Sequence, residues 1–317
     1  MNLFQRKRYY GYFFIAPFII GFLLFALYPI YNTLALSFTD TTLFNRQGSF
    51  IGLDNFRRLF ADDFFMTAVR NTWALWLMNF IPQIGIAMLL SVWFTSPRLR
   101  IKGVGAWRAL FYLPNLLAPA VIASLFYSLF SYYGPVNQFM VRSDFLPEAM
   151  HFLQSVPVTR GLVVFIQWWM WFGQTIIILM AGMTSIPVSF YEAAMVDGAN
   201  GVQMFRRITL PLLKPILIFI FVTSLVGGMQ IFDIPYLLSG DGRGSPQSSI
   251  LTNNLLMYLK FSSSKGHIGA ASSVGILIFI MTTVAALGIF YFLRDRDRDK
   301  VKTTKEKKPL KKGASNV

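Results

Sequence analysis

Long apolar stretches dominate the pattern of hydrophobic and polar positions along the chain. Six of them reach about 20 residues, the length that a helix needs to cross roughly 30 Å of hydrocarbon. Prolines interrupt several stretches without adding charge, as membrane-spanning helices tolerate. The pattern predicts an all-α polytopic membrane protein with six transmembrane helices. The predicted spans are 11–32, 72–95, 106–130, 160–183, 212–232 and 269–293.

The basic residues fall mainly between these stretches and after the last one. With six spans, both termini share one side of the membrane, and most of the 29 Lys and Arg residues lie on that side. Basic loops stay on the cytoplasmic side, so both termini are expected to be cytoplasmic. The sequence thus divides into a cytoplasmic N-terminus (1–10), a six-span domain (11–293) and a basic, disordered tail (294–317).

The first span is expected to remain as an anchor, since its apolar region is long and no small-residue cleavage site follows it. Three longer loops are expected on the outer side: 33–71, 131–159 and 233–268. In the first of these, an amphipathic pattern over Leu53–Phe65 places Phe56, Leu59 and Phe60 on one face. This pattern predicts a helix that lies on the membrane surface or docks a partner.

Composition supports a bilayer environment. Hydrophobic residues make up 55% of the chain and charged residues only 14%, which is too apolar for an ordinary soluble domain. The net charge of +15 does not indicate nucleic-acid binding, because the basic residues lie in loops rather than on one folded surface. Cysteine is absent, and His151 and His267 show no metal-ligand spacing. No metal, cofactor or nucleic-acid partner is therefore expected.

The cytoplasmic loop at 186–215 carries the clearest local signals. Ser189, followed three residues later by Glu192, predicts a capping box at the start of a first helix. Asp197 and Gly198 predict the turn that ends this helix.

A second short helix is expected directly after this turn. Asn200 and Gln203 predict another capping box, and the helix is expected to run to Leu210 before Pro211 ends it. So small an element cannot hide its own apolar residues, so some are expected to enter a groove on another protein. The alternative is a helix pair that rests on lipid. The apolar residues are Ala193, Ala194, Val196, Met204, Phe205 and Ile208.

A spaced pattern within this loop resembles the EAA motif of ABC importer permeases. The matching residues are Glu192, Ala193, Ala194, Gly198, Ile208, Leu210 and Pro211. In that family the loop forms coupling helices that seat in a cleft of the cytoplasmic ATPase subunit. The resemblance therefore implies an ATPase-coupling role for Glu192, Ala193, Ala194, Asp197, Gly198, Ala199, Phe205, Arg206, Ile208, Leu210 and Pro211.

The resemblance extends over nearly the whole chain and points to the sugar-importing, MalF-like class of type I importer permeases, with a MetI-like architecture. The similar segments are Tyr28–Asp40, Ile51–Phe60, Phe232–Gly242 and Gly266–Ser273. One departure is GDGRGSP at Gly240–Pro246, where the family usually has a glycine-proline turn.

The resemblance also implies partners and a location. They are a second (MalG-like) permease subunit, two ABC ATPase subunits and an extracytoplasmic solute-binding protein. The location is the bacterial cytoplasmic (inner) membrane, and the solute is a mono- or oligosaccharide moved by alternating access.

The source of energy must lie outside this chain. It has no GxxxxGK[ST] loop, and charges approach the spans only near their ends, as at Arg108, Arg160 and Lys214. An ion-coupled secondary carrier is disfavoured, since such carriers place ionisable residues within their spans. The same absence favours neutral sugars over glycerol phosphate or a peptide. A membrane-embedded enzyme is disfavoured because no catalytic constellation is present.

Neutral polar residues within the spans are the candidates for contact with a hydroxyl-rich solute. Helical spacing places three of them on one face of the fourth span and three on one face of the second. Interhelical hydrogen bonds and aromatic belts use the same residue types and remain the alternative. The candidates are Gln167, Trp171 and Gln174; Trp76, Asn79 and Gln83; and Asn115 and Gln230.

Overall fold

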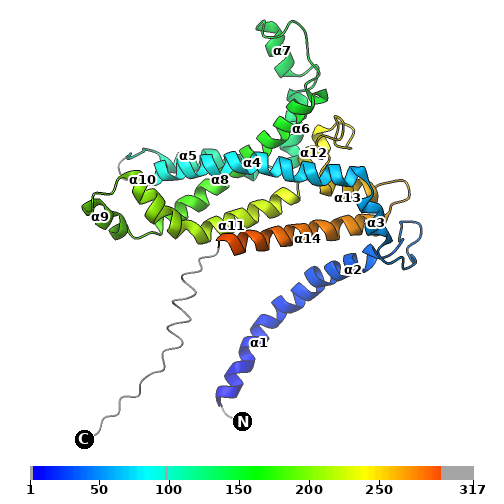
Figure 1. Ribbon diagram of the computed structural model, residues 1–317, viewed down its shortest axis with the longest axis horizontal. Coiled ribbons are helices and arrows are strands. Elements are labelled where there is room, and N and C mark those ends of the chain that lie inside the picture. Colours follow the sequence, from blue (N-terminus) through cyan, green and yellow to red (C-terminus); the bar gives the residue numbers. More distant parts are fainter. Residues whose placement is uncertain (1–2, 97–98, 294–317) are drawn as a thin grey trace.

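Helices form the regular structure of the protein in a computed structural model that describes residues 3–96 and 99–293 (Figure 1). The first half contains α1 (Leu3–Phe22), α2 (Tyr28–Ser37), α3 (Asp54–Phe60), α4 (Asp63–Thr95), α5 (Val104–Tyr112), α6 (Pro119–Leu129) and α7 (Pro135–Arg142). The second half contains α8 (Val156–Thr184), α9 (Val188–Val196), α10 (Gly201–Met204), α11 (Leu210–Met229), α12 (Asp233–Leu238), α13 (Asn253–Phe261) and α14 (Ile268–Leu293). The predicted tail at 294–317 lies outside the described residues.

Five of the six predicted spans are long apolar helical stretches. They are Tyr12–Ser37, Asp63–Thr95, Val156–Thr184, Gly201–Leu238 and Ile268–Leu293. The remaining span corresponds to a bent pair, Val104–Leu116 and Pro119–Leu129. Counted as one crossing, this pair completes the six spans in the predicted order.

The third span is sharply bent at the prolines that interrupt its apolar pattern. The two halves of the pair meet at an angle of 88°, and Leu117 and Ala118 between them are extended, with ψ of 144° and 133°. A residue that precedes proline is driven out of the helical region, which fixes Ala118. Pro119 then starts a new helix at a position that needs no N–H.

α4 and α8 form the centre of the bundle. They pack along each other, α11 packs against both, and α14 packs against α11 (Figure 1). Ala87 of α4, Ile176 of α8 and Leu213 of α11 are fully buried in one apolar cluster where these three helices meet. Apolar burial of this kind, rather than helix propensity, fixes how the helices sit against one another.

The first span is arranged differently from the others. α2 packs against α14, whereas α1 runs away from the bundle (Figure 1). In the most apolar window of Tyr12–Ser37, no residue is buried. So large an apolar surface requires lipid or another subunit to cover it.

The structure corrects the prediction of one surface helix at Leu53–Phe65, because this segment is divided between two helices. α3 ends at Phe60, and α4 begins at Asp63 after Asp62, whose carboxylate accepts from the Phe64 N–H at 3.0 Å. Leu59 is buried in the core beside α14, although Phe60 remains exposed. Leu59 therefore packs against the chain's own bundle, and only part of the predicted apolar face is left on the surface.

A hydrogen-bond network ties the segment before α13 to the two central helices. The Asn71 side-chain amide donates to the carbonyls of Ser248 at 2.7 Å and Leu251 at 3.1 Å. Arg160 donates to the Asn71 amide oxygen at 2.8 Å and to the Ser249 carbonyl at 2.9 Å. Buried carbonyls outside regular structure need such partners, so this network fixes the course of the segment.

Replacing Asn71 with alanine is expected to lower the stability of the protein by about 3 kcal/mol, since three hydrogen bonds are lost and their partners stay inside. The measurement is the unfolding temperature of the purified protein in detergent. Asn254→Ala is the matched control, because it removes one exposed amide bond, to the Gln230 carbonyl at 2.9 Å. Equal losses in the two variants would contradict the role given to Asn71.

Candidate functional site

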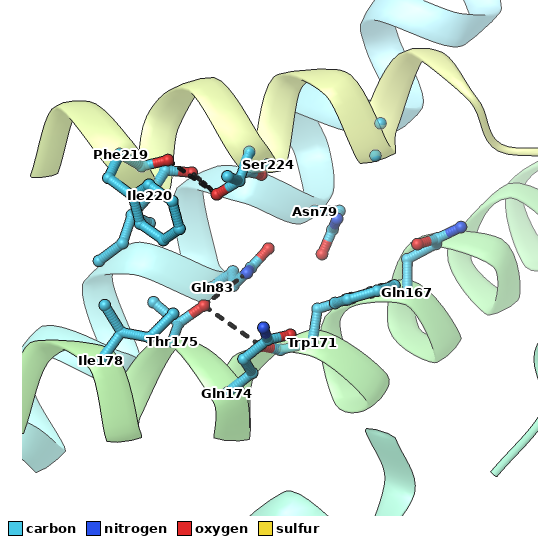
Figure 2. Close-up of a pocket in the computed structure, with 13 residues that line it drawn as sticks. Asn79, Gln83, Gln167, Trp171, Gln174, Thr175, Ile178, Phe219, Ile220 and Ser224 are labelled. Carbon is cyan, nitrogen blue, oxygen red and sulfur yellow. Dashed lines mark hydrogen bonds between the residues drawn. The ribbon is translucent and has the colours of Figure 1, made fainter. Parts of the chain in front are cut away.

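A cavity lies between α4, α8 and α11 in the middle of the bundle (Figure 2). Its space within this chain is about 130 Å³, and none of the residues that line it is charged. Of the eight residues predicted for the solute pathway, five line this cavity: Asn79, Gln83, Gln167, Trp171 and Gln174. The two polar stripes predicted on the second and fourth spans therefore face the same space.

Asn79 is the most unusual of these residues. Its side chain is only 4% exposed, yet its amide oxygen has no hydrogen-bond partner in the described part of the chain. Figure 2 shows the amide pointing toward the centre of the cavity. A buried amide oxygen without a partner costs about 1–3 kcal/mol, so it marks a place where a further group is expected to bind.

The glutamines of the fourth span also leave their polar ends available. Gln167 and Gln174 line the cavity about two turns apart on α8 (Figure 2). Within the described residues, neither side chain forms a hydrogen bond that would fix its amide. With Asn79, they present donors and acceptors that match a solute rich in hydroxyl groups.

Gln83 holds two helices together instead of leaving its amide free for a solute. Its side-chain amide donates to the Thr175 hydroxyl at 2.8 Å, and this hydroxyl donates to the Trp171 carbonyl at 3.2 Å (Figure 2). Ser91, two turns further along α4, donates to the Ile176 carbonyl of α8 at 3.2 Å. These bonds hold α4 against α8, as the alternative interpretation of the polar stripes anticipates for residues of this type.

Trp76 lies behind the cavity wall rather than in its lining. Its indole N–H donates to the Ser224 hydroxyl of α11 at 3.2 Å, and its ring stacks on Phe80 with the centroids 5.2 Å apart. A Cβ at Gly228 would overlap this ring, so the glycine allows α11 to approach. Trp76 therefore positions α11 against α4.

The last two predicted residues lie away from the cavity. Asn115 is half-buried in the 3₁₀ turn Leu113–Leu116 at the bend of the third span. Gln230 follows the end of α11 and faces a separate apolar groove between α11, α13 and α14. Their assignment to the solute pathway remains a prediction that this arrangement does not favour.

The prediction missed three hydroxyl-bearing residues of the lining. Thr175 on α8 and Thr223 and Ser224 on α11 line the cavity, together with Gly227. The available signal was a short run of small and hydroxyl-bearing residues within the otherwise apolar fifth span, a composition that is typical of close helix contacts in membranes.

The loop at 186–215 forms a helical elbow at the end of the bundle, where α9 and α10 join α8 to α11 (Figure 1). α9 begins at Val188 after Pro187, so the prediction of a Ser189 cap is wrong. Pro187 has an extended ψ of 132°, and its fixed φ of −58° suits the residue that precedes a helix.

The turn that closes α9 requires its glycine. The Ala199 N–H donates to the Ala194 carbonyl at 2.9 Å and the Gly198 N–H to the Met195 carbonyl at 3.1 Å, which is a Schellman motif. Gly198 adopts a φ of +77°, a left-handed conformation that costs an L side chain about 1–2 kcal/mol. The predicted turn at Asp197 and Gly198 is therefore present, with the glycine at its key position.

The predicted second capping box is confirmed. The Asn200 side chain accepts from the Gln203 N–H at 2.9 Å, and the Gln203 side chain accepts from the Asn200 N–H at 2.9 Å. The prediction that Pro211 ends this helix is wrong, because α10 continues through a π-helical turn at Phe205–Thr209 into α11. The wider turn directly before Pro211 relieves the clash that its ring would make with an ordinary α-helical turn.

The elbow is fixed on its inner side and open on its outer side. The Tyr191 and Thr209 hydroxyls lie 2.9 Å apart and join α9 to the π-helical turn. On the outside, Val196 is 89% exposed, and Phe190 and Val202 are more than half exposed. An exposed apolar patch on a rigid support is typical of a surface that another protein covers.

The residues predicted to couple to the ATPase include both exposed and partly buried ones. Those exposed on the elbow are Glu192, Ala193, Asp197, Gly198, Arg206, Leu210 and Pro211. Those partly buried against it are Ala194, Ala199, Phe205 and Ile208.

Comparison with known proteins identifies the class to which these features belong. Residues 48–298 match the family of binding-protein-dependent transport system inner membrane components. The chain belongs to this permease family. The lactose transport system permease protein LacF of Rhizobium radiobacter is 32% identical, over 92% of this chain and 97% of the relative. The arabinooligosaccharides transport system permease protein AraP of Bacillus subtilis is 29% identical, over 90% and 89%.

A solved structure has the same fold. It is a bacterial alginate ABC transporter in complex with an alginate pentasaccharide-bound periplasmic protein, and its TM-score against this permease is 0.75. The two chains are 24% identical, and the match covers 93% of this permease and 98% of the other chain. The predicted all-α, MetI-like membrane fold is thereby confirmed, and so is the expectation of a transport subunit rather than an enzyme.

Replacing Asn79 with leucine is expected to leave the stability of the permease unchanged or to raise it, because the change removes an unpartnered buried amide. Gln83→Leu, in contrast, is expected to cost about 1–3 kcal/mol, since it removes the buried hydrogen bond that joins α4 to the Thr175 hydroxyl of α8. Unfolding temperatures of the two purified variants test this contrast. A large loss of stability in Asn79→Leu would indicate a structural role for its amide.

Proposed function

We propose that the permease moves a neutral sugar through the cavity between α4, α8 and α11, as one membrane subunit of an ATP-driven importer. The buried amide oxygen of Asn79, which has no partner in the described part of the chain, is the observation that carries this proposal. A sugar hydroxyl supplies a donor for its oxygen, and Gln167 and Gln174 offer further amides on the facing helix. Trp171 in the same lining offers a ring face to the apolar side of a sugar.

The absence of charge in the lining supports a neutral solute. A phosphate or carboxylate in this cavity would lose its hydration without gaining an opposite charge, which is unfavourable. A permease for glycerol phosphate is therefore disfavoured, as is an ion-coupled carrier, which needs ionisable groups at such a site. The relatives named for lactose and for arabinooligosaccharides support the same class of solute.

The small size of the cavity supports the proposal of a second permease subunit. Its space of about 130 Å³ within this chain is well below the roughly 300–1,000 Å³ of a small-molecule site. We infer that a second, MalG-like permease supplies the rest of the wall. The uncovered first span and the apolar groove between α11, α13 and α14 give it surfaces to cover.

The elbow is the proposed contact with the motor. Two ABC ATPase subunits, one for each permease, are expected to receive the elbows in their clefts, with α9 as the coupling helix. This role places the elbow and both termini in the cytoplasm, and it places α7 and the segment after α12 on the outer face, where a solute-binding protein docks.

Transport by the reconstituted assembly tests the proposal. We expect proteoliposomes that contain both permeases and the ATPase to take up radiolabelled lactose or arabinotriose only with ATP and the binding protein. Asn79→Leu is expected to lower uptake about tenfold, the equivalent of one buried hydrogen bond, without loss of the assembly. Uptake that needs no ATPase, or a preference for sn-glycerol 3-phosphate, would contradict the proposal.

The elbow is tested separately through its glycine. Gly198→Val is expected to strain the turn after α9 and to reduce both ATPase co-purification and solute-stimulated ATP hydrolysis several-fold. Gly198→Asn is the matched control, since asparagine tolerates the left-handed conformation better and should retain most of both activities. A Gly198→Val variant that binds and stimulates the ATPase normally would be evidence against the coupling role.

A further inference from the structure

A second, separate cavity lies between the end of α6 and the segment that follows α12. Its volume is about 520 Å³, and it shares no lining residue with the central cavity. One wall is part of the GDGRGSP segment at Gly240–Pro246, where this sequence departs from the usual pattern of the class it resembles. The principal polar and aromatic lining residues are Tyr127, Tyr132, His151, Ser239, Asp241 and Ser245.

Aromatic rings form one side of this outer cavity. Tyr132 stacks on His151 with ring centroids 4.4 Å apart and an interplanar angle of 19°. Phe130 and Phe152 meet edge to face at 5.9 Å, and Tyr127 remains 39% exposed. Exposed ring faces of this kind bind the apolar face of a flat, partly polar ligand.

The lining of this cavity also includes a carboxylate, that of Asp241. The Asp241 carboxylate accepts from the Arg243 N–H at 2.8 Å and from the Ser245 hydroxyl at 2.5 Å. Partial burial opposes its ionisation, but these hydrogen bonds outweigh the burial and lower the pKa of Asp241 below its usual value. The group therefore stays ionised at neutral pH and keeps lone pairs that can accept from a ligand's hydroxyl groups.

Glycines allow the backbone of this segment to pack closely against its neighbours. Gly240 has a φ of +67°, and a Cβ at this position would lie 3.3 Å from the Tyr127 hydroxyl. Gly244 has a φ of +84°, and a Cβ there would meet the Leu251 backbone at 2.6 Å. Beneath them, Leu238 is buried in the core. The cavity is thus a preformed feature of the fold, which lowers the cost of binding a ligand.

We propose that this outer cavity is a second saccharide site, which holds one unit of a neutral sugar between the Tyr132–His151 pair and the Asp241 carboxylate. The proposal rests on the proposed function for the class of solute and for the side of the membrane from which solute enters. A negatively charged carboxylate in the wall disfavours acidic sugars. The site would receive solute before the central cavity does.

The test uses the intact assembly in nanodiscs, without ATP and without the binding protein. Saturation-transfer NMR is recorded with lactose, maltotriose, arabinotriose and trigalacturonate as probes. We expect a signal from at least one neutral probe and a weaker signal from trigalacturonate. Tyr132→Ala is expected to weaken neutral-probe binding about three- to tenfold, which corresponds to the loss of one ring contact.

Three further variants distinguish binding in the outer cavity from binding in the central cavity or on the nearby surface. Asp241→Asn is expected to weaken the neutral probes and to reduce the bias against trigalacturonate. Phe139→Ala, which removes an exposed ring of α7 outside the cavity, is the matched control and should leave binding unchanged. Asn79→Leu alters the central cavity alone, so the signal that depends on Tyr132 should persist in it.

The result that overturns the proposal is a set of spectra in which no probe shows a signal sensitive to Tyr132→Ala. If the assembly still imports sugar, the proposed function stands and only the outer site fails. If the Tyr132-dependent signal is present but the assembly imports no sugar, the proposed function fails and the outer site stands. If Tyr132→Ala changes no sugar signal but lowers the affinity for the binding protein, titrated separately onto the same nanodiscs, the cavity is a protein-docking surface and the proposal is wrong.

Discussion

Inside a bilayer no water is available to satisfy a polar side chain, so each amide or hydroxyl in a span must find its partner in the protein or in a solute. The interface between α4 and α8 contains both outcomes. Gln83 and Ser91 bond across it to α8, and these bonds hold the two central helices together. Asn79, about one turn from Gln83, faces the cavity without a partner in the described part of the chain. The constraint that fixes the packing therefore also marks the place left for a solute.

The same two helices connect this cavity to the elbow. α8 lines the cavity and leads directly into α9, and α11 leaves the elbow through the π-helical turn and lines the opposite wall. Between the two ends, Leu213 and Met183 are buried in one apolar cluster, so the helices are packed together along this length. Under the proposed function, a displacement of the elbow would move both walls of the cavity at once, which is what alternating access requires of a coupling element.

Local chemistry was sufficient to predict some of these features from the sequence. The capping box of Asn200 and Gln203 depends on four neighbouring residues, and it forms as predicted. The spacing of Gln167, Trp171 and Gln174 depends only on helical periodicity, and all three line one cavity. The prediction of six spans depends only on the length of the apolar stretches. The structure has these spans in the predicted order, one of them as a bent pair.

The errors arise where two local rules compete or where the answer depends on a distant segment. Ser189 has the residue type of a cap, but Pro187 before it already fixes the start of α9. Pro211 is a residue type that usually ends a helix, but the π-helical turn before it makes room for its ring and the helix continues. Trp76 and Asn79 share one stripe on α4, and only the register of α11 decides that one bonds to Ser224 while the other faces open space. Helical periodicity describes each helix separately, so a single sequence does not predict how α11 is aligned against α4.

The two cavities also differ in the state of their polar groups, and this difference bears on the order in which they would act. The carboxylate of the outer cavity already has hydrogen-bond partners and lies near water, so a sugar gains little there and leaves readily. The amide of the central cavity is buried and unsatisfied within the described residues, so a sugar that reaches it supplies a missing partner but must first lose its own water. If both proposals hold, weak capture at the outer face precedes a step that needs energy, and that step is the one to which the elbow couples ATP.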